Sequence, residues 1–363
     1  MKKYSLLIFI LLLTISFLFN SCRPPELEGA VVHFNYERYD EAYKLALEST
    51  EKYPDNPEAW FLLGRIQGKK GQIKEMVESF DKSLAINNTY EPDIKSEQSV
   101  YFSKYYNDAV SAYNTYIKIE DRESEAATKR LNSVIENFQN ALQIKNDYMA
   151  HRLSSVAYTN LKDDENALKS LEKAKDADPD TVLAWIDLGY YFSRKKEFNK
   201  AADYFKNGLE VDPDNIECLT LYAQNLDFAD RRDDAIEAYK IAFEKNQQEK
   251  AIPFNLGLLL NKQANAIEDD DSKKKGLLEE AAVYFKKAQE IDPELKDVYD
   301  ILSAVLIQLE RFDEAEELLN KGIEFYPDSA NMWQNLSFLY ARTGKKKEAE
   351  EAYEKSKQLR GEE

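Results

Sequence analysis

The sequence predicts an all-α fold, an α-solenoid in which antiparallel helix pairs repeat along nearly the whole chain. Proline-centred breaks recur at a fixed step, because Pro179 to Pro213 and Pro293 to Pro327 each span 34 residues. Between the breaks, apolar residues follow the period of an amphipathic helix. The composition agrees, with 43% hydrophobic and 32% charged residues and 11 glycines among 363 residues. These values are typical of a soluble helical protein and argue against disorder.

The clearest repeat unit lies between Pro179 and Pro213. Small residues are expected where two helix axes approach to about 8–10 Å, and bulky residues fill the spaces between the helices. Pro213 ends the second helix because it lacks the N–H that a helix interior needs. The predicted first helix carries Trp185, Leu188, Gly189 and Phe192, and the second carries Ala201, Phe205 and Gly208.

This arrangement of bulky, small and proline positions at 34-residue steps resembles the tetratricopeptide repeat (TPR) family. The resemblance implies a TPR α-solenoid, a right-handed superhelix of helix-turn-helix repeats, here about nine of them within residues 27–361. Two units are longer than the rest and should form lengthened hairpins at about 91–147 and 250–295. In the first of these we expect roughly three additional turns in each helix, and in the second under two.

The N-terminus has the pattern of a targeting segment. Lys2 and Lys3 precede an apolar run, Leu6 to Phe19, that is followed by Ser21 and Cys22. As a helix the run would measure about 21 Å, at roughly 1.5 Å per residue, which is short for a hydrocarbon core of about 30 Å. Residues 1–21 are therefore predicted to be a signal peptide.

The segment Leu18-Phe19-Asn20-Ser21-Cys22 resembles the lipobox of bacterial lipoproteins. The resemblance implies cleavage before Cys22, acylation of its side chain, and a short lipid-anchored tether over residues 22–26. The alternative is an ordinary secretory signal followed by an incidental cysteine. Because Cys218 is the only other cysteine, a disulfide framework is absent, which favours acylation.

Charge and motif content exclude several classes of function. The formal net charge is -18, and the basic residues are interleaved with a larger number of acidic residues. The chain therefore lacks the clustered basic residues that bind nucleic acid. His33 and His151 occupy repeat positions that hold core side chains, so a structural role is favoured for both. The acidic run Glu268 to Asp271 lacks the alternating ligands and central glycine of an EF-hand loop. We expect no catalytic residues, no metal site and no cofactor.

The resemblance places binding on the concave surface, which the exposed positions of the first helices line. These positions offer apolar and hydrogen-bonding groups that suit an extended peptide or a partner helix. The alternative is that some of them pack against neighbouring helices. The predicted groove residues are Ile186, Tyr190, Arg194, Thr220, Gln224, Asp227, Phe254, Leu258 and Asn261.

These features predict a non-enzymatic scaffold that binds peptide or protein partners in the bacterial cell envelope. Its membrane contact would be the lipid at Cys22. Arg23 is not the aspartate that favours inner-membrane retention in some bacteria, so the outer membrane facing the periplasm is the preferred location. The alternative function is a carrier that holds a small apolar or peptide ligand for an envelope transporter.

Overall fold

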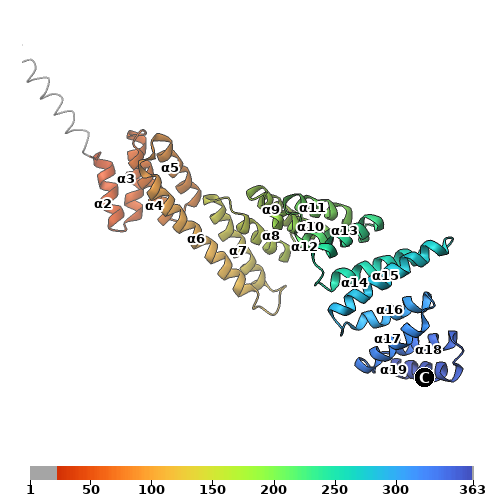
Figure 1. The fold of residues 1–363 in the computed structure, drawn as a ribbon. Coiled ribbons are helices and arrows are strands. Elements are labelled where there is room, and N and C mark those ends of the chain that lie inside the picture. The colour runs from red at the N-terminus through yellow and green to blue at the C-terminus, as the bar shows by residue number, and fades with distance from the viewer. Residues whose placement is uncertain (1–22, 362–363) are drawn as a thin grey trace, which may run out of the picture. The chain divides into compact units, whose positions relative to one another are not determined.

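A computed structural model of the chain describes residues 23–361. All regular elements in this span are helical and none is a β-strand (Figure 1). The prediction of an all-α fold is therefore confirmed. The predicted signal peptide, 1–21, and the predicted lipidation site, Cys22, lie outside the described residues. The chain divides into two compact units, Met1–Asp178 and Pro179–Glu363.

The first unit contains four helix pairs within its described part, each made of two consecutive helices joined by a short connection. The pairs are α2 (Pro25–Asn35) with α3 (Tyr39–Lys52), α4 (Pro57–Lys69) with α5 (Ile73–Ile86), α6 (Glu91–Tyr116) with α7 (Glu125–Ile144), and α8 (Tyr148–Asn160) with α9 (Asp164–Ala177). A short 3₁₀ helix, η1 (Asn88–Tyr90), precedes α6.

The second unit contains five pairs of the same kind up to residue 361, which brings the described total to the nine that the sequence predicts. The pairs are α10 (Val182–Arg194) with α11 (Phe198–Val211), α12 (Ile216–Phe228) with α13 (Arg232–Lys245), α14 (Ala251–Asn265) with α15 (Asp271–Ile291), α16 (Lys296–Gln308) with α17 (Phe312–Phe325), and α18 (Ala330–Arg342) with α19 (Lys346–Arg360).

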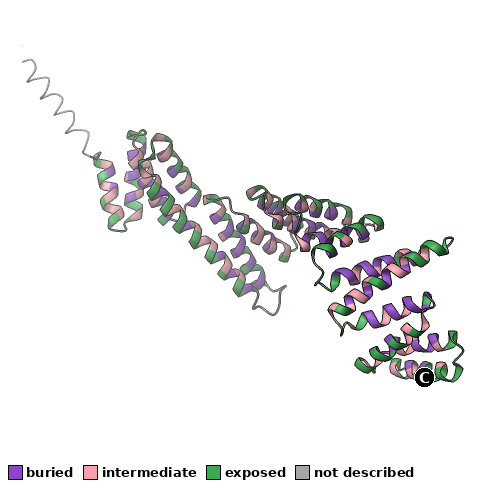
Figure 2. Ribbon diagram, in the orientation of Figure 1, coloured by how far each residue is buried: buried purple, intermediate pink, exposed green. Residues whose placement is uncertain are grey.

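The helices pack through the small and bulky residues that the repeat supplies. Gly189 lies against the ring of Phe205, so close that a Cβ at residue 189 would be 2.6 Å from ring carbons. Phe205 and Ala201 are completely buried. Buried residues accordingly gather on the facing sides of paired helices, while exposed residues dominate the connections (Figure 2). The helix pairs therefore meet where the sequence pattern predicts close contact.

An aromatic donor ties each of four proline breaks to the helix that follows it. Trp185 Nε1 donates a hydrogen bond to the carbonyl of Pro179, six residues earlier, over 3.1 Å. The same bond recurs from Trp60 to Pro54, from Tyr299 to Pro293 and from Trp333 to Pro327. The bond satisfies the polar atom of an aromatic ring that is half-buried or, at Tyr299, completely buried, and it fixes where the chain turns into the next helix.

The turn between the two helices of a repeat uses a left-handed residue. Lys162, Lys196 and Asp230 have φ values of 62°, 61° and 60°, and they lie 34 residues apart. Gly71 and Gly344 occupy the same place in other repeats, with φ values of 75° and 80°. The repeat imposes this backbone conformation even where the residue is not glycine.

The two lengthened pairs divide their extra residues unequally. α6 has 26 residues and α7 has 20, against 13 and 14 in α4 and α5. The expectation of about three extra turns in each helix is therefore wrong for α7, because residues 117–124 form the connection instead. In the other lengthened pair α14 has 15 residues and α15 has 21, so almost all of the added helix is in α15.

Within residues 23–361, no helix combines the length and the apolar character that crossing a membrane requires.

Candidate functional site

The first helices of the second unit carry the row of predicted groove residues. On α10, Tyr190 is 41% exposed, and its ring meets Phe205 edge-on at 6.0 Å between centroids. The Tyr190 hydroxyl donates a hydrogen bond to Glu217 at the start of α12, over 3.3 Å. Partial burial and the charge of Glu217 raise the pKa of Tyr190, so its hydroxyl stays protonated. Arg194 is exposed at the end of the same helix.

Ile186 is not part of the open surface. Its side chain is only 3% exposed, although it precedes Tyr190 by about one helical turn. α10 packs against both α11 and α12, so its buried stripe is wider than one face. The helical period gives the direction of a side chain but not the neighbour that covers it, and for Ile186 packing against adjacent helices is what the structure shows.

The predicted residues of α12 are mostly engaged within the protein. The Thr220 hydroxyl donates to the carbonyl of Ile216 in its own helix, over 2.8 Å. The Asp227 carboxylate accepts a hydrogen bond from Lys262 of α14, also over 2.8 Å. Asp227 therefore holds two first helices side by side, and Gln224 is the exposed member of the three.

The predicted residues of α14 are half-buried. Phe254 meets the ring of Phe285 edge-on at 5.8 Å between centroids, and Leu258 packs on the same core cluster. Asn261 accepts a hydrogen bond from Asn265 over 3.0 Å. These three side chains contribute part of their surface to the row, and their remaining atoms support the core.

The second unit also contains a groove, further along the chain. α15, α16 and α18 enclose a groove of about 790 Å³. Its floor is apolar, because Leu278, Ile307 and Leu309 are buried to 91% or more, and Phe338 stands at its side with 54% of its surface exposed. The volume falls within the range of about 300–1,000 Å³ that is usual for ligand sites.

The rim of this groove is charged. Lys274 and Lys275 lie in the first turns of α15, and Arg342 lies at the end of α18. Arg342 pairs with Glu310 over 3.3 Å, and both side chains are at least half exposed. The rim therefore combines three cations with the carboxylates of Asp271 and Glu310, in a chain with a net charge of -18.

The groove continues the phase of the predicted row. Phe338 and Arg342 lie 148 residues after Tyr190 and Arg194, which is four 34-residue repeats plus the 12-residue insertion. Phe338 and Arg342 were not among the predicted groove residues, because the predicted row ends at Asn261. Counting the same step through the insertion would have found both residues.

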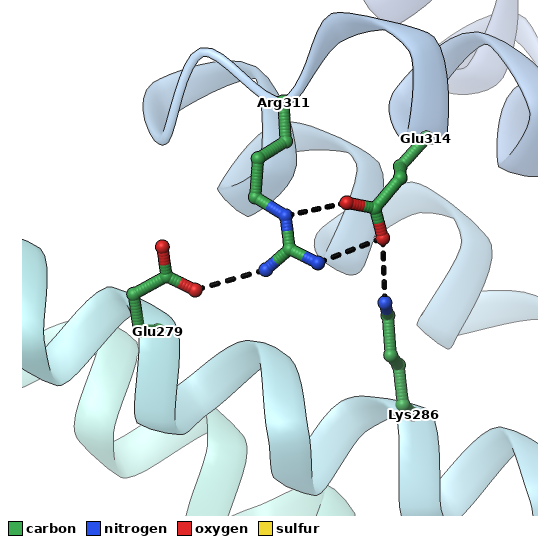
Figure 3. Close-up of polar contacts among 4 residues, drawn as sticks. All are labelled: Glu279, Lys286, Arg311 and Glu314. Carbon is green, nitrogen blue, oxygen red and sulfur yellow. Dashed lines mark hydrogen bonds and ion pairs between the residues drawn. The ribbon is translucent and has the colours of Figure 1, made fainter.

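A network of charges holds α15 against α17 beside the groove (Figure 3). Arg311 makes two hydrogen bonds to Glu314, of 2.6 and 2.7 Å, and a third to Glu279 over 2.9 Å. Lys286 also binds Glu314, over 2.7 Å. These bonds hold the pKa of Glu314 down at about 2, with Arg311 the larger influence and Lys286 the next. The network fixes the lengthened helix that carries the lysines of the rim.

Cys218, whose side chain is of a reactive type, lies in the packed interior of the second unit. Cys218 is completely buried, its thiol donates to the carbonyl of Phe205 over 3.1 Å, and burial raises its pKa to about 12. The thiol is therefore protonated and shielded, as a packing residue is. Among residues 23–361, no group of three or more His, Cys, Asp or Glu side chains is arranged to hold a metal ion.

Comparison with known families identifies the repeat. Three family models described as tetratricopeptide repeat match residues 45–78, 151–181, 182–215, 274–337 and 330–362, which together make up more than half of the chain. The chain belongs to the tetratricopeptide repeat family. The TPR fold that the sequence predicts is thereby confirmed, and the chain is a repeat protein of the protein-binding type.

One solved structure shares the TPR fold over most of the chain, and a second is similar over about half of it. The crystal structure of the C-terminal part of a TPR repeat-containing protein from Cytophaga hutchinsonii has a TM-score of 0.50 and 13% identity, and the match covers 85% of this chain and 99% of that one. YrrB, described as a TPR protein with an unusual peptide-binding site, is 23% identical with a TM-score of 0.44, covering 55% of this chain and 96% of that one.

Two curated sequences also match part of the chain. The protein O-mannosyl-transferases TMTC3 of Homo sapiens and Mus musculus are each 26% identical to it, over 180 and 164 residues. The matches cover 47% and 43% of this chain. The chain spans only about a fifth of the length of these relatives, 19% and 17% respectively.

Proposed function

We propose that this TPR chain is a membrane-anchored scaffold of the bacterial cell envelope that binds protein or peptide partners in the second unit. The observation that carries the proposal is the groove between α15, α16 and α18. It joins an apolar floor to a charged rim and an exposed aromatic side chain, Phe338. Such a combination suits a peptide that buries apolar side chains and fixes its orientation by polar contacts.

The proposed binding surface extends beyond the groove to exposed residues at equivalent positions of other repeats. Tyr190, Arg194 and Gln224 are exposed on α10 and α12, in the register that Phe338 and Arg342 occupy on α18. A partner that follows the first helices would meet an aromatic and an arginine at both ends of this row. Tyrosine, phenylalanine and arginine are the residue types in which interfaces are enriched.

The test uses a photo-reactive phenylalanine analogue placed at two matched positions in living cells. Phe338 lies in the groove, and Tyr353 on α19 is an aromatic of similar exposure, 44%, outside the groove lining. We expect a discrete crosslinked partner from position 338, absent from position 353, and lost when Arg342→Glu reverses the charge of the rim. Equal capture from both positions, or capture that survives the charge reversal, would refute the assignment of the groove.

The volume of the groove also keeps the carrier function as a second candidate. About 790 Å³ could hold a small ligand as well as a segment of peptide. Native mass spectrometry of protein extracted in mild detergent separates the two functions. A bound small molecule would favour the carrier, and a retained protein partner would favour the scaffold.

A further inference from the structure

A polar cavity in the first unit lies where other repeats have a filled apolar core. On α8, His151 and Ser154 occupy the positions that Trp185 and Leu188 hold 34 residues later. Leu188 is completely buried, and its counterparts Leu63, Leu256, Leu302 and Leu336 are buried to 96% or more. Serine is much smaller than leucine, and a hollow of about 650 Å³ opens beside it, lined by α7, α8 and α9.

Most of the side chains that line this cavity are polar: His151 and Ser154 are buried at its base, whereas the lysines at its edge are exposed. His151 is only 8% exposed, and its Nε2 lies 2.8 Å from Oδ1 of Asn146. Gln139 of α7 donates to the hydroxyl oxygen of Tyr158 over 3.2 Å, which leaves the Tyr158 O–H free to serve as a donor. Burial, with the nearby charge of Lys173, lowers the pKa of His151, so its ring is neutral at neutral pH.

The charged side chains around the hollow are two lysines and one aspartate. Lys169 and Lys173, one turn apart on α9, line it with their cationic side chains, and each ammonium group has three N–H donors and no acceptor. Gln143 of α7 adds an amide, and Asp176 is the only carboxylate among the lining residues. A chain of net charge -18 has thus gathered a local excess of positive charge at this place.

We propose that this cavity is a second binding site, which takes an acidic peptide segment in an extended conformation. Lys169 and Lys173 would hold its carboxylates, since an ammonium group forms strong, charge-assisted hydrogen bonds with a carboxylate. The amides of Gln139 and Gln143 match the donors and acceptors of a peptide backbone. The site lies wholly in the first unit, so it does not depend on the groove of the second unit.

The proposal follows from the cost of polar residues at core positions. A buried histidine and serine stabilise a repeat less than the tryptophan and leucine that the same positions hold elsewhere, and polar groups need partners when buried. The serine hydroxyl is satisfied within the helix, since it donates to the carbonyl of Ala150 over 2.7 Å. The histidine and the serine therefore leave an open space with lysine ammonium donors at its edge.

The test is fluorescence anisotropy with the purified full chain at low ionic strength, where charge contacts are least screened. The probe is a fluorescein-labelled hexaglutamate peptide, and the comparison probe is hexaglutamine. Ser154→Leu introduces the leucine that five other repeats have at this position and fills the cavity. Lys173→Glu reverses one charge of the lining, and Lys129→Glu makes the same change at an exposed position of α7 outside the lining.

We expect hexaglutamate to bind at least about tenfold more tightly than hexaglutamine, as hydrogen bonds to charged groups allow. Ser154→Leu and Lys173→Glu should each weaken binding about tenfold or more, while Lys129→Glu leaves it nearly unchanged. Circular dichroism checks that the variants fold. If Ser154→Leu does not fold, the comparison of Lys173→Glu with Lys129→Glu still tests the site.

Three outcomes would overturn the proposal. Equal binding of the two peptides would show that carboxylates are not recognised. An equal loss in Lys173→Glu and Lys129→Glu would show diffuse attraction in place of a site. Competition by glutarate as effective as that by unlabelled hexaglutamate would show that the cavity takes a small dicarboxylate and not a peptide.

Discussion

Single glycines set how closely the helices of this TPR chain approach. Gly64, Gly189 and Gly257 each lie on a first helix against a phenylalanine ring of the second, and an added Cβ would be 2.6–2.8 Å from that ring. The partner rings, Phe80, Phe205 and Phe285, are completely buried. Because a packed ring has no space into which to move, these glycines are required by packing and not by backbone conformation.

Gly189→Ala should destabilise the second unit. The added methyl group overlaps the Phe205 ring, and overpacking costs about 1–3 kcal/mol, of which the better helix propensity of alanine returns up to about 1 kcal/mol. We expect a net loss of up to about 2 kcal/mol, measured as a lower midpoint of urea unfolding.

Gly276→Ala on α15 is the matched control for that change. An added Cβ there has no atom within 4 Å, so only the propensity gain of up to about 1 kcal/mol remains. The control should be as stable as the unaltered protein or more stable. A loss in both variants would mean that the close contact at Gly189 is not the cause.

The burial of most of these residues was predicted correctly because equivalent positions recur in each repeat. The small and bulky residues of the unit between Pro179 and Pro213 are buried as expected, except Trp185, which is half-buried. Exposure was predicted less well, as Ile186 shows. The period of a helix specifies a face, whereas burial depends on the neighbour that covers it.

At the scale of elements, the repeat pattern did not predict how the two insertions are structured. The positions of the added residues were clear from the spacing of the prolines, but their division between helix and connection was not. In α15 the added turns bring Lys274 and Lys275 to the rim of the groove. The repeat pattern contains no counterpart of these turns, so that wall of the site could not be predicted from the sequence.

The ion network between α15 and α17 should make stability depend on acid pH. Because the pKa of Glu314 is lowered from 4.5 to about 2 in the folded protein, its contribution is complete above its ordinary pKa. The contribution is lost as the pH falls from about 4.5 to about 2, where the folded state also takes up the proton. The Glu314 side chain is 43% exposed, so solvent screening should keep the effect modest.

Thermal unfolding of Glu314→Gln against the unaltered protein measures this contribution. The difference in Tm should be present at about pH 7 and should disappear near pH 2. Glu317→Gln, three residues later on the same helix and outside the network, should show no such change. A difference for Glu314→Gln that persists undiminished at low pH would mean that packing, and not charge, stabilises the contact.

At the scale of the whole molecule, the proposed function separates attachment from recognition. Attachment is proposed to reside in Cys22, ahead of α2, and recognition in the two units. Cys22→Ala should move the protein from the membrane fraction to the soluble fraction, since stable anchoring needs the acyl chains. Detergent phase partitioning of cell extracts measures the change.

Cys218→Ala provides the control for this fractionation, because that thiol is buried and its loss should leave the protein in the membrane fraction. If the Cys22→Ala protein remained in the membrane fraction, the lipid anchor would be wrong. The scaffold function would then require a different route to the membrane.

Hydrogen–deuterium exchange of the full chain, with and without the peptide captured from position 338, tests the central claim most directly. Binding in the groove should slow exchange in the first turns of α15 and the last turns of α16 and α18, because these segments carry its lining residues. Exchange in α19 should not change. Protection confined to the α6–α7 hairpin, or no protection at all, would contradict a binding surface formed by α15, α16 and α18.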